Sequence, residues 1–196
     1  MKKLILTLCS AFLFTISFAQ LKSGDAQLDK RLEEYCIYNV KQDYKNLVEY
    51  YHSSIFKIVP KQTMLKSLEA NANDESFKLS YDTMRITAIS PVFKVDSAAY
   101  HKVTFYSYFT MSVADEESVK DEDFTKSLIG TFQAFYPGKS VSYSKEKNLF
   151  IVAGEENMIA VKDAENPEWT FLGYNEYQED VIKNVLPEEV FNHFKN

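Results

Sequence analysis

The side chains best suited to acid–base chemistry in this chain are its three histidines, His52, His101 and His193. They are far apart in the sequence, and none has a metal-ligand spacing such as His-x-x-x-His. Two roles are open to His52: a residue at a helix C-terminus, where positive charge is stabilising, or a general base in a pocket. His101, at the start of a strand, and His193, in the tail, are expected at the surface.

Carboxylates gather in one segment, Asp115–Asp123, which has six of them in nine positions. Their oxygens would suit calcium, but the segment lacks the order and the turn glycine of an EF-hand. We therefore expect a solvated loop and no metal site. The chain also has no glycine-rich phosphate loop, no nucleophile elbow and no Cys-x-x-Cys pair, so no cofactor is expected.

Aromatic residues are the better pointers to a binding site. The chain has 13 tyrosines and a single tryptophan, Trp169. Tyr106 and Tyr108 share one face of the longest predicted strand, where hydroxyl groups in an apolar cavity would orient a ligand. The alternative is ordinary packing within the sheet or a dimer interface. The candidate ligand-binding residues are Tyr51, His52, Tyr106, Tyr108 and Trp169. No catalytic residue is identified.

Helical periodicity accounts for the N-terminal part of the chain. Apolar side chains recur at three- and four-residue steps from Asp25 to about Ser54, with Asp25 as the cap and a break near Gln42. Pro60 fits the first turn of a second helix.

The pattern then changes to the alternation of β-strands. Strands are predicted over residues 77–81, 84–89, 92–95, 100–113, 140–143, 149–152, 157–162 and 169–174, with a helix inserted over 124–136 and a helical tail around Val181, Ile182 and Val185. Short turns between strands indicate antiparallel pairing. The predicted fold is α+β: N-terminal helices packed on a curved antiparallel sheet, with an inserted helix and a C-terminal helix.

The first twenty residues have the pattern of a secretory signal peptide. Two lysines precede an apolar run, Leu4–Phe18, and the small residues Ser17 and Ala19 stand at the −3 and −1 positions of a cleavage site before Gln20. The run is short for a membrane helix, and Cys9 is misplaced for a lipid anchor. We expect residues 1–19 to be removed, residues 20–196 to form one domain, and the protein to work in the periplasm or outside the cell.

The charge and the cysteine content of the chain limit the classes of partner that are expected. The net charge of −6 becomes −8 without the two leader lysines, and no basic patch stands out. Nucleic acid and membrane surfaces are therefore not expected partners after cleavage. Cys36 would be left without an intramolecular partner, and its place on an apolar helix face predicts a small buried hydrophobe; a reactive thiol or an intermolecular bridge is the alternative.

Residues 42–56, QDYKNLVEYYHSSIF, resemble a helix of the nuclear transport factor 2-like (SnoaL-like, cystatin-like α+β) superfamily. Residues 158–172 resemble the closing hairpin of that superfamily, with its Trp-x-Phe strand. The resemblance implies a cone in which a helix closes a sheet around an apolar cavity. The superfamily holds isomerases, dehydratases, polyketide cyclases and non-enzymatic binding or dimerisation modules, so it implies no single function.

The leading hypothesis is an exported module that binds a small apolar ligand or forms a homodimer through its sheet. The alternative is a cofactor-free isomerase, dehydratase or hydrolase that uses the cone cavity. An accessory protein, for example in envelope assembly, is a third class.

Overall fold

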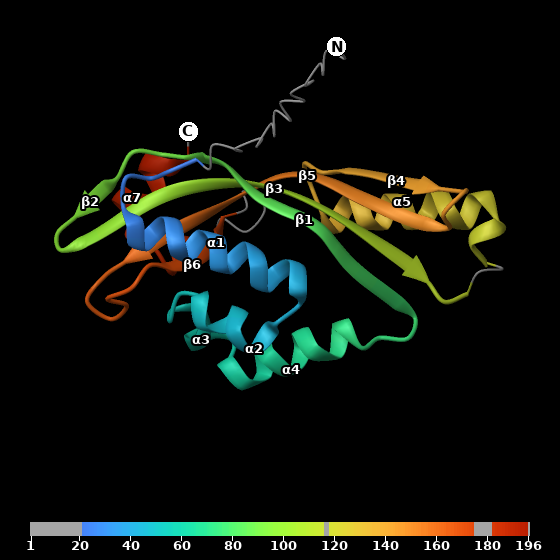
Figure 1. Cartoon of the computed structure of the whole chain (residues 1–196), viewed down its shortest axis with the longest axis horizontal. Coiled ribbons are helices and arrows are strands. Elements are labelled where there is room, and N and C mark those ends of the chain that lie inside the picture. The colour runs from blue at the N-terminus through green and yellow to red at the C-terminus, as the bar shows by residue number, and fades with distance from the viewer. Residues whose placement is uncertain (1–20, 116–117, 175–181, 196) are drawn as a thin grey trace, which may run out of the picture.

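The computed structural model describes residues 21–115, 118–174 and 182–195, so the predicted signal peptide and Val181 lie outside the described residues. The described part is α+β, with one six-stranded antiparallel sheet and helices on both of its faces (Figure 1). The strands are β1 Phe77–Ile89, β2 Phe93–Val95, β3 Ala98–Val113, β4 Ser140–Ser144, β5 Leu149–Lys162 and β6 Thr170–Tyr174. The helices are α1 Ala26–Lys41, α2 Tyr44–Leu47, α3 Ile55–Ile58, α4 Lys61–Ala72, α5 Glu122–Phe135 and α7 Glu188–Phe194, with short 3₁₀ turns η1 Val48–Tyr50 and η2 Ser118–Lys120.

The sheet is open. Its order is β1-β3-β5-β4, with β2 beside β3 and β6 beside β5, so β1 and β4 form the two ends of the order. Two pairs of predicted short strands are single long strands, which corrects the prediction. β1 carries register shifts at Asp82 and Thr87, and such bulges change the phase of the alternation within one strand. β5 runs unbroken through Glu155 and Glu156, which pair with Tyr106 and Phe105 of β3.

The predicted break in the first helical stretch is confirmed. α1 ends at Lys41, and Gln42 adopts a left-handed conformation with a φ of 54°. The side-chain amide of Gln42 donates to the carbonyl oxygen of Leu79, at 2.8 Å, which ties the break to β1. The helical path ends before Ser54, because Tyr51 forms a β-bridge with Phe171 of β6.

Alternation along β3 divides the sheet into an inner and an outer face. Val103, Phe105, Phe109 and Met111 are all buried on the inner face. α1 packs on the part of that face around Val103 and Phe105, and α5 packs on the part around Phe109 and Met111. Figure 1 shows α1 along the left half of the sheet and α5 along the right half.

Described residues cover the outer face at one end of the sheet. Ile182, Leu186 and the apolar side chains of α7 pack there on Tyr100 and Ile159. Tyr106 and Tyr108 lie farther along this face and are half-buried, and they share one face of the strand, as predicted.

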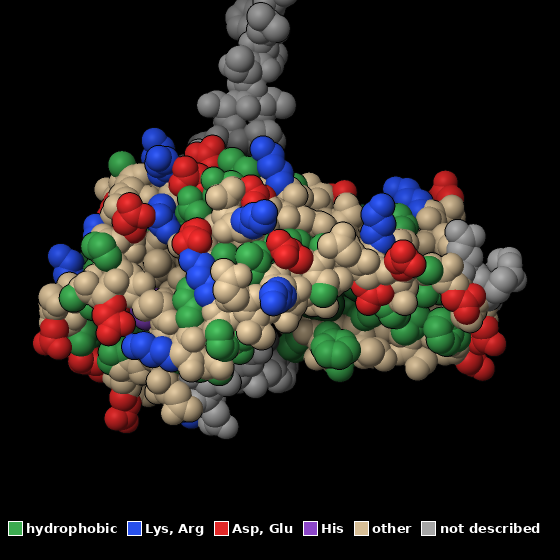
Figure 2. All heavy atoms as spheres, turned by 90° about the horizontal axis from the view of Figure 1, so that it is seen from below, with side chains coloured by type: hydrophobic (Ala, Val, Ile, Leu, Met, Phe, Trp, Pro, Cys, Tyr) green, Lys and Arg blue, Asp and Glu red, His purple; other side chains and the backbone are tan. Residues whose placement is uncertain are grey.

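α5 also carries exposed apolar surface. Figure 2 shows hydrophobic side chains gathered over α5, on the right of the view. Phe124 and Phe135 contribute to it, and Phe135 is 74% exposed. Among the described residues, no helix combines the length and the apolar content that crossing a bilayer requires.

Candidate functional site

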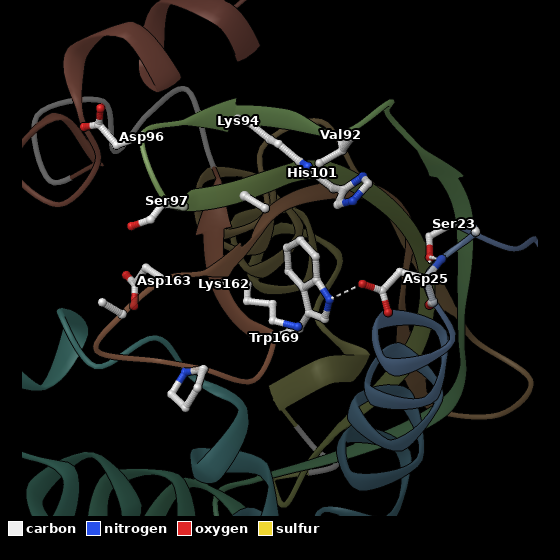
Figure 3. A pocket seen from close by; sticks show the side chains of 15 residues that line it. Ser23, Asp25, Val92, Lys94, Asp96, Ser97, His101, Lys162, Asp163 and Trp169 are labelled. Carbon is white, nitrogen blue, oxygen red and sulfur yellow. Dashed lines mark hydrogen bonds between the residues drawn. The ribbon is translucent and has the colours of Figure 1, made fainter.

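A pocket of about 820 Å³ opens where the β2–β3 hairpin, the start of α1 and the β5–β6 turn meet (Figure 3). We call it the Trp169 pocket, after the residue that precedes β6 and is only 2% exposed. Its lining includes Asp25, Val92, His101, Lys162, Asp163 and Trp169, and also the polar or charged side chains of Ser23, Lys94, Asp96 and Ser97.

Trp169 is held in place by the N-cap of α1. Its indole Nε1 donates to Oδ2 of Asp25 at 3.0 Å, as drawn in Figure 3. Oδ1 of Asp25 accepts from the backbone N–H groups of Gln27 and Leu28, which caps the helix as predicted. Burial acts to raise the pKa of Asp25, but these hydrogen bonds and the charge of Lys162 outweigh it and lower that pKa. The carboxylate is therefore ionised at neutral pH.

Lys162 supplies a cation beside the indole. Its Nζ lies 5.9 Å from the centre of a ring of Trp169 and donates to Oε1 of Gln27 at 2.8 Å. The ammonium group is therefore already held by the protein beside the ring.

His101 is buried, at 4% exposure, which corrects the expectation of a surface residue. Its ring lies 5.2 Å from the ring of Trp169, between centroids. Nδ1 is 2.8 Å from the carbonyl oxygen of Ser90, which can only accept, so Nδ1 carries the proton. The neutral ring then has its lone pair on Nε2, which has no hydrogen-bond partner among the described residues. The sequence did hold a signal, because alternation places residue 101 on the same strand face as Val103.

His52 lies behind the wall of the pocket and is 6% exposed. It follows η1 instead of ending a long helix, and its backbone N–H donates to the carbonyl of Phe171 at 3.0 Å. Its Nε2 is 3.1 Å from Oδ2 of Asp163, which lines the pocket, and its Nδ1 is 2.5 Å from Oγ of Ser54. Burial acts to raise the pKa of Asp163, but hydrogen bonds from Asn166 and His52 outweigh it and lower that pKa.

The predicted binding residues are not gathered in one site. Trp169 lines the pocket, and His52 reaches it through Asp163. Tyr51 packs edge-on against Tyr35, with ring centroids 6.4 Å apart, and burial raises the pKa of Tyr51 to about 12. Tyr106 and Tyr108 are on the outer face of the sheet, away from the pocket lining.

A second buried polar group lies on the inner face of the sheet and was not foreseen. Lys139 donates through Nζ to Oγ of Ser107 at 2.6 Å and pairs with Oε1 of Glu156 at 3.2 Å. Burial lowers the pKa of Lys139, although Glu156 opposes the shift. Its side chain lies over Gly154, and we assign this group a structural role.

Neither a metal centre nor a known relative stands out. Among residues 21–115, 118–174 and 182–195, no three His, Cys, Asp or Glu side chains converge as a metal site would require. Comparisons with models of protein families, with curated proteins and with solved structures found no match.

Proposed function

We propose that this chain is an exported binding module that takes a small, mainly apolar molecule in the Trp169 pocket. The observation that carries this proposal is a buried indole beside a buried histidine acceptor in a cavity of about 820 Å³. Small-molecule sites commonly have volumes of roughly 300–1,000 Å³ and a few polar groups that fix the orientation of the ligand.

The partners of the polar side chains indicate the chemistry of the ligand. Asp25, Asp163 and Lys162 each have hydrogen bonds inside the protein, whereas Nε2 of His101 has none among the described residues. A ligand that donates one hydrogen bond would give Nε2 of His101 a partner. A small phenol combines such a hydroxyl group with an apolar ring that can pack near Val92.

We also propose that the exported form begins at Gln20, and that the fold is an open variant of the nuclear transport factor 2-like cone. Support for the second proposal comes from α1, which packs on the inner face of an antiparallel sheet. N-terminal sequencing of the exported protein tests the first proposal, and a start at Met1 would contradict it.

A homodimer through the outer face of the sheet is the second candidate. It is favoured by Tyr106 and Tyr108, which lie half-buried beyond the part of that face that α7 covers. Native mass spectrometry distinguishes the candidates, because a dimer that dissociates on Tyr108→Glu, with no retained small molecule, would favour pairing over ligand binding.

Trp169 allows a direct test, because it is the only tryptophan in the chain. Titration with small phenols such as para-cresol should change its fluorescence saturably. His101→Phe keeps a ring beside Trp169 and removes the acceptor, so we expect affinity to fall about tenfold, as for one lost hydrogen bond. The matched control is His193→Phe, since His193 is exposed and stacks on Phe93. A linear, unsaturable response, or equal affinity in the two variants, would contradict the proposal.

A further inference from the structure

A continuous chain of hydrogen bonds joins Ser54, His52 and Asp163, of which Asp163 lines the Trp169 pocket. Oγ of Ser54 is 2.5 Å from Nδ1 of His52, and Nε2 of His52 is 3.1 Å from Oδ2 of Asp163. Ser54 and His52 are two residues apart, whereas Asp163 comes from the turn between β5 and β6. A hydroxyl, an imidazole and a carboxylate in this order are the parts of an activated nucleophile.

The hydrogen-bond donors around His52 define its tautomer. The two N–H groups of the Asn166 amide have acceptors in Oδ1 of Asp163, at 3.0 Å, and Oγ of Ser53, at 3.1 Å. Nδ2 of Asn166 also lies 3.1 Å from Nε2 of His52. Because both N–H groups of that amide have these other acceptors, Nε2 can carry the proton and donate it to Asp163. The backbone N–H of Ser54 points at Nδ1 from 3.3 Å, which requires a lone pair there. Nδ1 is thus the basic nitrogen, and it faces the Ser54 hydroxyl.

We propose that Ser54 is a nucleophile that accepts an acyl group from small esters, with His52 as its general base. Oγ of Ser54 attacks the ester carbonyl carbon while its proton moves to Nδ1 of His52. The C–O bond to the alcohol then breaks, and the alcohol leaves with that proton. Water, deprotonated by His52, attacks the acyl-serine, and the carboxylic acid and free Ser54 are released. Asp163 is a positioning residue that holds the imidazole and stabilises its protonated form.

The neighbouring serine provides an internal comparison. Ser53 and Ser54 are both partly exposed, but Oγ of Ser53 contacts the amide of Asn166 instead of an imidazole. A positioned general base typically contributes about 10²–10⁴-fold to a rate. Ser54 should therefore react at least about 100-fold faster than Ser53 with an electrophile that both can reach.

The test is labelling of the intact, folded protein with a fluorophosphonate, followed by peptide mass spectrometry. We expect one phosphonyl group on Ser54, no adduct in Ser54→Ala, and an unchanged rate in Ser53→Ala. The same proteins should show a burst of nitrophenol from para-nitrophenyl acetate that Ser54→Ala abolishes. Absence of an adduct on Ser54, or equal labelling of Ser53, would overturn the proposal.

Variants of the other two residues test the relay itself. His52→Gln should lower the labelling rate at Ser54 at least about 100-fold, the lower end of the usual contribution of a general base. Asp163→Asn should lower the rate and move the acid limb of its pH profile to lower pH, because the imidazolium loses its anionic partner. Thermal unfolding of each variant confirms that it is folded. If folded Asp163→Asn keeps the wild-type labelling rate and pH profile, Asp163 only stabilises the β5–β6 turn and is not a positioning residue.

This activity goes beyond ligand binding, and the two can fail separately. Ser54 is outside the lining of the Trp169 pocket, which shares only Asp163 with the relay. Saturable phenol binding without labelling of Ser54 would support the binding module and contradict the proposal that Ser54 is a nucleophile.

Discussion

Replacement of Gly154 by alanine tests the packing of the inner face. A Cβ atom at Gly154 would come within 3.0 Å of both Cα and Cγ of Lys139 and 3.2 Å of its Cβ. One of the closest atoms is backbone, so relief requires movement of the β4–β5 pairing and not only a new rotamer. Forcing an extra carbon into a packed site typically costs about 1–3 kcal/mol.

The same movement would disturb the buried contacts of Lys139 with Ser107 and Glu156, which adds to the cost. Alanine recovers about 0.5–1 kcal/mol, because glycine loses more backbone entropy on folding. We therefore expect Gly154→Ala to lower the free energy of unfolding by about 1–2 kcal/mol. The assay is equilibrium unfolding in urea, followed by the fluorescence of Trp169.

Gly130 is the matched control. It lies in α5, and a Cβ atom there would meet nothing within 4 Å. Gly130→Ala should therefore raise the free energy of unfolding by about 0.5–1 kcal/mol. The two substitutions should therefore change the free energy of unfolding in opposite directions. Equal or greater stability in Gly154→Ala would refute the close packing of Lys139 on β5.

Three further predictions concern Asp25, acid stability and Cys36. Asp25→Ala removes the N-cap of α1 and the acceptor of the indole, and should cost about 1–2 kcal/mol in urea unfolding; a loss under 0.3 kcal/mol would contradict the cap. Asp25 and Asp163 both have lowered pKa values in the folded state, so their stabilisation is present above their unfolded values of about 3.9 and is lost as the pH falls through the folded values. Urea midpoints measured from pH 5 to pH 2 should therefore fall less steeply in the Asp25→Asn, Asp163→Asn double variant; an equal slope would count against these shifts. Burial raises the pKa of the Cys36 thiol to about 12, so a chain that begins at Gln20 should react with a disulfide reagent only after unfolding, and rapid reaction of the folded protein would place Cys36 at the surface.

Local signals in the sequence were sufficient for much of the secondary structure. The Asp25 cap, the break at Gln42 and the helix after Pro60 depend on nearby residues, and each is present in the structure. The strand boundaries were less accurate. The bulges in β1 depend on pairing with β3, which no local pattern encodes.

The candidate site was harder to predict because it is assembled from distant segments. Asp25 meets Trp169 across 144 positions, and His52 meets Asp163 across 111. His101 could have been assigned to the inner face from strand alternation alone. Lys139 gave no such signal, since an isolated lysine is normally exposed and its burial follows from the gap above Gly154.

The most direct test of ligand binding in the Trp169 pocket is native mass spectrometry of the protein purified under mild conditions, mixed with para-cresol. We expect a one-to-one complex that is weakened in His101→Phe and retained in His193→Phe. Spectra with no complex at any phenol concentration, or with equal complex in all three proteins, would contradict it.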